Sequence, residues 1–198
     1  MNTSLIDLNS PADTSRRRFL GGAVALASGL IVPSWATANT PQDAAFWAQP
    51  RWVDIYRPAL GNKRVRSIYW RNGGLDTSGY RELCNLFQDH RAQKAAAIDP
   101  RLFDLLCAMQ AWLRAYGYDR PLRLNSGYRT PGNNAKLEGA ARNSMHLYGR
   151  AADVIFEGLP TAYVGKLAQA YSGGGVGFYY SSGFVHVDTG RVRTWRGG

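Results

Sequence analysis

A short segment near the carboxyl end, Phe184–Asp188 with the sequence FVHVD, most constrains how this chain can fold. Side chains alternate between the two faces of a strand, so Val185 and Val187 share one face while His186 and Asp188 share the other. The valines can enter a hydrophobic core. An imidazole and a carboxylate then lie side by side on the opposite face, where burial is unfavourable unless each finds a partner or a metal ion.

A second apolar run, 151–156, poses the same problem, because Asp153 lies among alanine, valine, isoleucine and phenylalanine. His146 precedes this carboxylate with Gly149 between them, so a loop entering a strand can bring both side chains to one point. His186 on a neighbouring strand then supplies a third ligand. Two imidazoles and one carboxylate, with a fourth position open to water, are the composition of a catalytic zinc site.

Taken singly, each of these residues also fits a structural role. A lone histidine beside a strand is more often hydrogen-bonded within the protein than bound to metal. Asp153 can cap a neighbouring segment, and Arg129, which follows a Ser-Gly-Tyr turn, can be an ordinary ion-pair partner. Their joint occurrence is what favours a metal site. His90, at the end of a predicted helix where cations are favourable, is interpreted as structural.

The residues around the first histidine also match a known pattern. Ser144, His146, Gly149, Ala151 and Asp153 resemble the S-x-H-x-x-G-x-A-x-D signature of the LAS-type zinc peptidases, the D-Ala-D-Ala carboxypeptidase or M15 group. Five fixed positions of mixed chemistry rarely recur by chance, so the resemblance is specific.

Further stretches are similar to one subfamily of that group, the periplasmic murein endopeptidases, also called the domain-of-unknown-function 882 group. They are 126–131 and 184–195, with 89–91 and 99–100 upstream. The resemblance covers 51–198. It implies an α+β domain of the M15 type, with a small antiparallel sheet and flanking helices.

The resemblance also implies roles for single residues. One zinc ion per chain is held by His146, Asp153 and His186. Arg129 binds or polarises the carbonyl or carboxylate of the substrate, because a guanidinium has a permanent charge and a rigid fork of donors. Ser144, assigned with Arg129 to substrate binding, orients the loop of His146 by hydrogen bonding.

The chain departs from the family pattern at the general base. In many relatives a carboxylate three residues before the last histidine, or a second histidine two residues before it, serves as base. Gly183 and Phe184 occupy those positions here. Asp188 is the candidate for catalysis in their place. It acts either as the base or as a carboxylate that orients His186, and both roles stay open.

Hydrophobic periodicity predicts helices early in the domain and mostly strands later, which is typical of the α+β class. Cys84 and Cys107 fall on the apolar helix faces and are interpreted as buried thiols, with a disulfide between them left open for an exported protein. The predicted elements are a hairpin of 51–57 and 64–71, helices at 80–87 and 100–113, strands at 122–125 and 151–156, a helix at 163–171, a turn at 173–177 that leads into a strand, and a closing hairpin of 184–189 and 192–195 about Gly190.

The amino-terminal segment 1–38 resembles a twin-arginine export signal. Arg16-Arg17 precedes a short Gly/Ala-rich apolar stretch, and a small-x-small site predicts cleavage after Ala38. The segment therefore predicts a bacterial protein that the twin-arginine machinery exports to the periplasm and that keeps no stable membrane span after cleavage. A linker is predicted at 39–50 and the peptidase-like domain at 51–198.

The chain has 24 Lys and Arg residues against 14 Asp and Glu, a formal charge of +10, which suits an anionic cell-wall polymer. We expect an exported zinc metallopeptidase that hydrolyses amide bonds in peptidoglycan stem peptides or cross-links during cell-wall remodelling. The alternative is a catalytically degenerate, zinc-containing wall-binding module. A non-haem iron oxygenase is disfavoured because no histidine follows Asp188. No nucleic-acid partner is expected for an exported protein.

Overall fold

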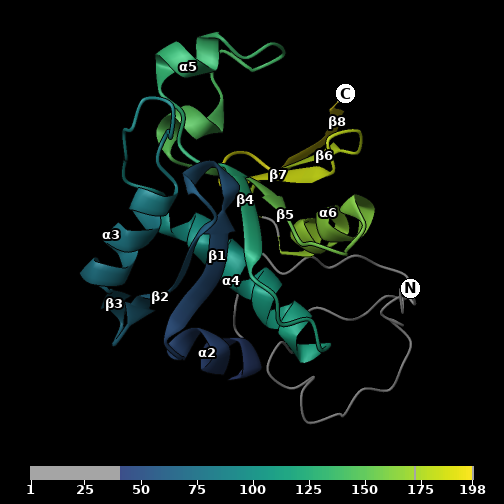
Figure 1. Cartoon of the computed structure of the whole chain (residues 1–198). Helices are drawn as coiled ribbons and strands as arrows, with labels where there is room; N and C mark the ends of the chain where they lie inside the picture. The colour runs from purple at the N-terminus through teal and green to yellow at the C-terminus, as the bar shows by residue number, and fades with distance from the viewer. Residues whose placement is uncertain (1–40, 172, 198) are drawn as a thin grey trace.

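The computed structural model describes residues 41–171 and 173–197, so the predicted signal segment 1–38 lies outside the described residues (Figure 1). Its elements are, in order, α2 (Pro41–Ala48), β1 (Arg51–Arg57), η2 (Pro58–Leu60), β2 (Lys63–Arg71), β3 (Gly74–Leu75), α3 (Thr77–Leu86), α4 (Pro100–Ala115), β4 (Leu122–Ser126), α5 (Pro131–Ala135), η3 (Met145–Tyr148), β5 (Ala151–Ile155), α6 (Thr161–Ala170), β6 (Gly175–Tyr179), β7 (Phe184–Asp188) and β8 (Arg193–Gly197).

The described strands form one eight-stranded sheet in the order β3-β2-β1-β4-β5-β7-β6-β8. The pairs β1–β4 and β6–β8 are parallel and the others are antiparallel. The α+β class is confirmed, but the prediction of a small antiparallel sheet is wrong. The long crossover through α3 and α4 returns the chain beside β1 in the same direction, which makes the sheet mixed and extends it.

The predicted closing hairpin is also wrong. β8 does not pair with β7; it pairs in parallel with β6, with Gly177 opposite Trp195. β5 pairs with one edge of β7 and β6 with the other, so β7 has no free backbone edge left for β8. The turn at Gly190 therefore carries the chain past β6 to the outer edge of the sheet.

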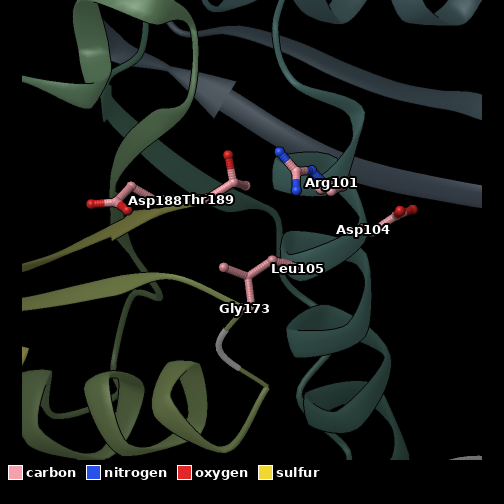
Figure 2. Close-up of a pocket in the computed structure, with 6 residues that line it drawn as sticks. All are labelled: Arg101, Asp104, Leu105, Gly173, Asp188 and Thr189. Carbon is pink, nitrogen blue, oxygen red and sulfur yellow. The ribbon is translucent and has the colours of Figure 1, made fainter. Parts of the chain in front are cut away.

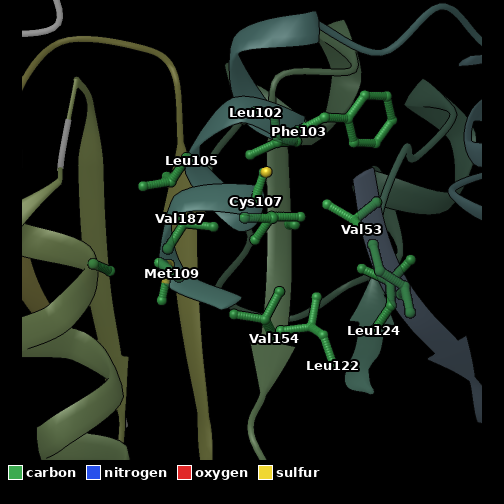
Figure 3. Packing of buried hydrophobic residues seen from close by; sticks show 14 of the residues in the cluster. Val53, Leu102, Phe103, Leu105, Cys107, Met109, Leu122, Leu124, Val154 and Val187 are labelled. Atoms are coloured by element: carbon green, nitrogen blue, oxygen red, sulfur yellow. The ribbon is translucent and has the colours of Figure 1, made fainter. Parts of the chain in front are cut away.

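The hydrophobic core lies on the face of the sheet that the helices cover. Apolar side chains of α4 pack there against alternate residues of β1, β4, β5 and β7 (Figure 3). Val185 and Val187 are buried in this core, as the strand alternation predicts. Cys84 and Cys107 are buried free thiols on the same face. The opposite face at β5 and β7 is left for polar groups.

The helix predicted to start at Asp99-Pro100 begins there, because the Asp99 carboxylate accepts a hydrogen bond from the backbone N–H of Arg101. The segment predicted as a linker, 39–50, is largely helical, since α2 lies within it. Phe46 of this helix packs against the core. No helix in the described part of the chain has the length and apolar character that a membrane crossing requires.

Candidate metal centre

Three separate elements bring His146, Asp153 and His186 together. His146 lies in η3, Asp153 in β5 and His186 in β7, and all three are buried. Asp153 and His186 are direct partners in the β5–β7 ladder, so their side chains leave the sheet side by side on the same face. One ligand atom from each residue lies within 4.8 Å of the other two.

Gly149 lets the loop of His146 reach this position. Its backbone has a φ of 63°, and a Cβ atom there would collide with the carbonyl oxygen of Ala97. The Gly149 carbonyl also accepts a hydrogen bond from the Asp99 N–H over 2.9 Å, which fixes the end of η3 against the start of α4. The glycine of the signature is therefore required by a left-handed turn in a close contact.

The distances between the three ligand atoms match one face of a coordination tetrahedron. His146 Nε2 lies 3.2 Å from both Asp153 Oδ1 and His186 Nδ1, and His186 Nδ1 lies 2.9 Å from Asp153 Oδ1. Zinc bonds of about 2.0–2.1 Å in a tetrahedral site give ligand–ligand separations of about 3.3 Å. The observed set is slightly tighter but of that size.

The protons of both imidazoles are used elsewhere. His146 Nδ1 donates to the carbonyl oxygen of Gly127 over 2.6 Å, and that oxygen can only accept. His186 Nε2 donates to Asp188 Oδ2 over 3.0 Å. When both imidazoles are neutral, the atoms that converge from His146, Asp153 and His186 are therefore all lone-pair acceptors. Such a cluster could hold a metal ion at its centre, and a donor set of two nitrogens and one oxygen fits zinc.

The pKa directions show how the three groups act on one another. Burial lowers the pKa of His146, so its imidazole is neutral over a wide pH range. Burial alone would raise the pKa of Asp153, but the two imidazoles hold it well below its ordinary value. Burial would lower the pKa of His186, yet the carboxylates of Asp153 and Asp188 outweigh this and raise it, so a proton on His186 Nδ1 competes with a cation for this position.

Arg129 lies beside these residues, as the sequence predicts. Its Nε donates to Ser126 Oγ over 3.2 Å, Nη1 donates to Asn134 Oδ1 over 3.2 Å, and Nη2 donates to Asp153 Oδ2 over 3.4 Å. The side chain is 16% exposed. One N–H on each terminal nitrogen remains available to a ligand, because a guanidinium carries five N–H donors.

The contacts of Asp188 favour one of its two candidate roles. Its carboxylate is fully buried and accepts hydrogen bonds from the backbone N–H groups of Gly175 (3.0 Å) and Gly190 (2.8 Å), from Arg193 (2.7 Å) and from His186. A carboxylate enclosed in this way is suited to fix the orientation of the His186 ring. It presents no open edge to a substrate as a base would.

The hydrogen bonds described for Ser144 are made by its backbone. Its carbonyl oxygen accepts from the Leu147 N–H over 3.0 Å, and its N–H donates to the Ala141 carbonyl over 3.2 Å. The residue precedes η3 without a side-chain capping bond. These main-chain contacts join Ser144 to the loop of His146, and the predicted role of Ser144 in substrate binding stays a prediction.

The sequence did not single out Asp89 as a support of the site. This buried carboxylate accepts from the backbone and hydroxyl of Thr130, both over 2.8 Å, and from the side-chain amide of Asn133. It thereby anchors the loop that carries Arg129. The only signal was its place in an Asp-His-Arg stretch that fits the subfamily. His90, in the same stretch, is exposed, and the charged groups that act on it are Arg57, Arg91 and Asp89 rather than the candidate ligands.

A cavity of about 230 Å³ lies on the α4 side of Asp188 (Figure 2). None of the three candidate ligands lines it. Its lining residues are Arg101, Asp104, Leu105, Gly173, Asp188 and Thr189.

Comparison with known proteins gives a consistent family. A peptidase M15 family model described as Peptidoglycan L,D-endopeptidase MepK matches residues 45–195. The peptidoglycan L,D-endopeptidase MepK of Escherichia coli K12 is 35% identical over 189 residues, which cover 92% of this chain and 98% of that protein. The probable peptidoglycan L,D-endopeptidase MepK of Haemophilus influenzae is 31% identical over 191 residues, with 93% and 97% covered.

Proposed function

Because this chain belongs to the peptidase M15 family, in the branch described as peptidoglycan L,D-endopeptidase MepK, we propose that it is a murein endopeptidase. It hydrolyses amide bonds between L- and D-configured centres in the stem peptides or cross-links of peptidoglycan. It does so in the periplasm, to which the segment 1–38 directs it through the twin-arginine machinery. The domain that carries the activity spans 51–198.

The convergence of three buried lone-pair acceptors on one point carries this proposal. His146 Nε2, Asp153 Oδ1 and His186 Nδ1 would hold one zinc ion per chain. Zinc in such a site supplies Lewis-acid chemistry, since it polarises a carbonyl group and acidifies water. The hydrogen bonds to Gly127 and Asp188 keep each imidazole in the required tautomer and orientation.

Arg129 binds the substrate beside the ligands. Three of its N–H groups are held by Ser126, Asn134 and Asp153, which fixes the plane of the guanidinium. The two remaining N–H groups hydrogen-bond the carbonyl or carboxylate of the peptide and stabilise negative charge that develops on the carbonyl oxygen. Because Arg129 also pairs with Asp153, the position of this substrate-binding side chain depends on one of the three metal ligands.

Digestion of purified peptidoglycan sacculi, with mass spectrometry of the released muropeptides, tests the function. The wild-type protein should release peptides cleaved at L,D bonds, and a chelator should stop the release. His146→Ala should abolish it. His90→Ala is the matched control, because His90 is exposed and the groups that act on it do not include the three ligands, and it should retain full activity. Products cut only at D,D bonds would contradict the proposed bond specificity.

A wall-binding module without catalysis is the second candidate. The observation in its favour is that the two positions that carry a base in many relatives hold Gly183, in an exposed turn with a φ of 69°, and Phe184. A protein that contains zinc and sediments with sacculi but releases no muropeptide would establish this function instead.

A further inference from the structure

Aromatic side chains line the metal centre on the side away from Arg129. Asp153, His186, Gly177 and Trp195 are consecutive partners across β5, β7, β6 and β8, so they form one row on the same face of the sheet. The Trp195 ring reaches back over Gly177 toward the ligand, and its centroid lies 5.2 Å from that of the His186 ring.

The next row on this face is Phe184, Tyr179 and Gly197. The rings of Tyr179 and Phe184 are stacked, with centroids 4.4 Å apart and an interplanar angle of 13°. A Cβ atom on Gly177 would meet the Trp195 ring, and one on Gly197 would meet the Tyr179 ring. The two glycines therefore make room for the rings to lie flat on the sheet beside the centre.

A hydrogen bond fixes the phenol within this aromatic surface. Trp195 Nε1 donates to the Tyr179 hydroxyl oxygen over 3.3 Å. An indole N–H can only donate, so the phenol oxygen is the acceptor and the phenol keeps its own proton for another partner. In the part of the chain that the structure describes, no acceptor takes that proton. Tyr179 is half-buried, so part of the residue reaches the surface.

Tyr179 and Arg129 approach the centre from opposite directions. Arg129 extends from the loop after β4, whereas Tyr179 lies on β6 beyond β7 in the strand order. The two are close enough to interact: burial lowers the pKa of Arg129, and the phenol of Tyr179 is, after Asp153, the group that opposes this. The three ligands therefore lie between a guanidinium with free donors and a phenol with a free donor.

We propose that the Tyr179 hydroxyl is a second substrate-contacting donor, which hydrogen-bonds the carbonyl oxygen of the scissile peptide bond together with Arg129. Trp195 is a positioning residue that acts through Tyr179. The inference rests on the proposed endopeptidase function and adds a residue to its machinery. A donor that is already fixed in place stabilises the negative charge of the transition state without reorganisation.

The test uses Tyr179→Phe, which keeps the stacked ring and removes only the hydroxyl. With a purified cross-linked muropeptide as substrate, kcat should fall about 100-fold while KM changes little, as for loss of one oxyanion donor. Zinc content and the thermal midpoint should match the wild type. Trp195→Phe should lower kcat less, because the phenol stays but loses its fixed orientation.

Tyr180→Phe is the matched control. Tyr180 is the next residue along the chain, but its ring stacks on Phe178 and contacts Arg196, away from the ligands. It should leave kcat and KM unchanged. If the wild type is active and Tyr179→Phe has the same kcat, or differs from it only in KM, this inference is contradicted while the proposed function stands. A wild type that releases nothing overturns the proposed function and this inference with it.

Discussion

Two buried carboxylates, Asp89 and Asp153, have opposite surroundings. Asp89 is 4% exposed and accepts hydrogen bonds from five donors of the chain: two on Thr130 and one each on Arg91, Ala92 and Asn133. Asp153 is 7% exposed, and its Oδ1 faces the lone pairs of two imidazoles whose protons are bound elsewhere. Arg129 reaches only its other oxygen, over 3.4 Å.

The difference shows that burial alone does not identify a ligand. Asp89 is satisfied by the protein, so it stabilises a loop. Asp153 pairs with Arg129 through one oxygen only, and when both imidazoles are neutral the atoms around the other oxygen are acceptors. A structural carboxylate is surrounded by N–H and O–H donors, whereas a candidate metal ligand is surrounded by other lone-pair acceptors.

The largest effect is expected from Asp153→Asn, a change that keeps the shape of the side chain. It removes the negative charge from the ligand set, so zinc affinity should fall by more than about 100-fold, the upper effect of changes in outer-shell partners. Hydrolysis should be lost with it. Competition with a chelating dye measures the affinity. If the variant bound zinc like the wild type, Asp153 would not be a ligand.

A smaller loss is expected from Asp188→Asn, which weakens the hydrogen bond that orients His186. Zinc affinity or activity should fall about 10- to 100-fold. Part of the structure should loosen as well, because the same carboxylate pairs with Arg193. Activity that vanished at full zinc occupancy would instead assign Asp188 to proton transfer.

Asp89→Asn should lower the stability of the protein and leave its zinc affinity unchanged, the opposite of the result expected for Asp153→Asn. The hydrogen bonds to a charged acceptor are lost or weakened, so the free energy of unfolding should fall by about 2–3 kcal/mol. Zinc affinity should stay near the wild-type value, because none of the three ligands touches Asp89. Urea unfolding and the dye titration measure both. If Asp89→Asn left the stability unchanged but impaired zinc binding, Asp89 would belong to the metal centre and would not be a structural carboxylate.

The smallest effect is the pH dependence of that stability difference. The hydrogen bonds from Thr130, Asn133 and Ala92 outweigh burial and hold the pKa of Asp89 well below its ordinary value. A depressed folded-state pKa stabilises the protein above the unfolded pKa of about 3.9, and this contribution is lost as the pH falls toward the folded value. The difference in the free energy of unfolding between the wild type and Asp89→Asn should therefore be constant near neutral pH and decrease below about pH 4.

The local features of this protein follow from the sequence. The stripes of apolar residues predict α3, α4 and α6, and the alternation in 184–188 correctly predicts which side chains of β7 enter the core. The three candidate ligands could be named because a charged group in an apolar strand requires a partner. Each of these inferences depends on a few neighbouring residues.

The non-local features do not follow from the sequence in the same way. The pairing of β8 with β6 depends on which backbone edges earlier strands already occupy, and hydrophobic periodicity does not encode that. The helix α2 was missed because a short polar segment is typical of a linker. The support from Asp89 depends on a loop more than forty residues later in the chain, at Thr130 and Asn133.

An anomalous diffraction map at the zinc absorption edge, recorded from crystals of the zinc-loaded protein, would locate the metal ion directly. One peak per chain is expected, at about 2.0–2.2 Å from His146 Nε2, Asp153 Oδ1 and His186 Nδ1. A peak within bonding distance of the other nitrogen of either histidine, or a peak away from these three residues, would contradict the proposed zinc site.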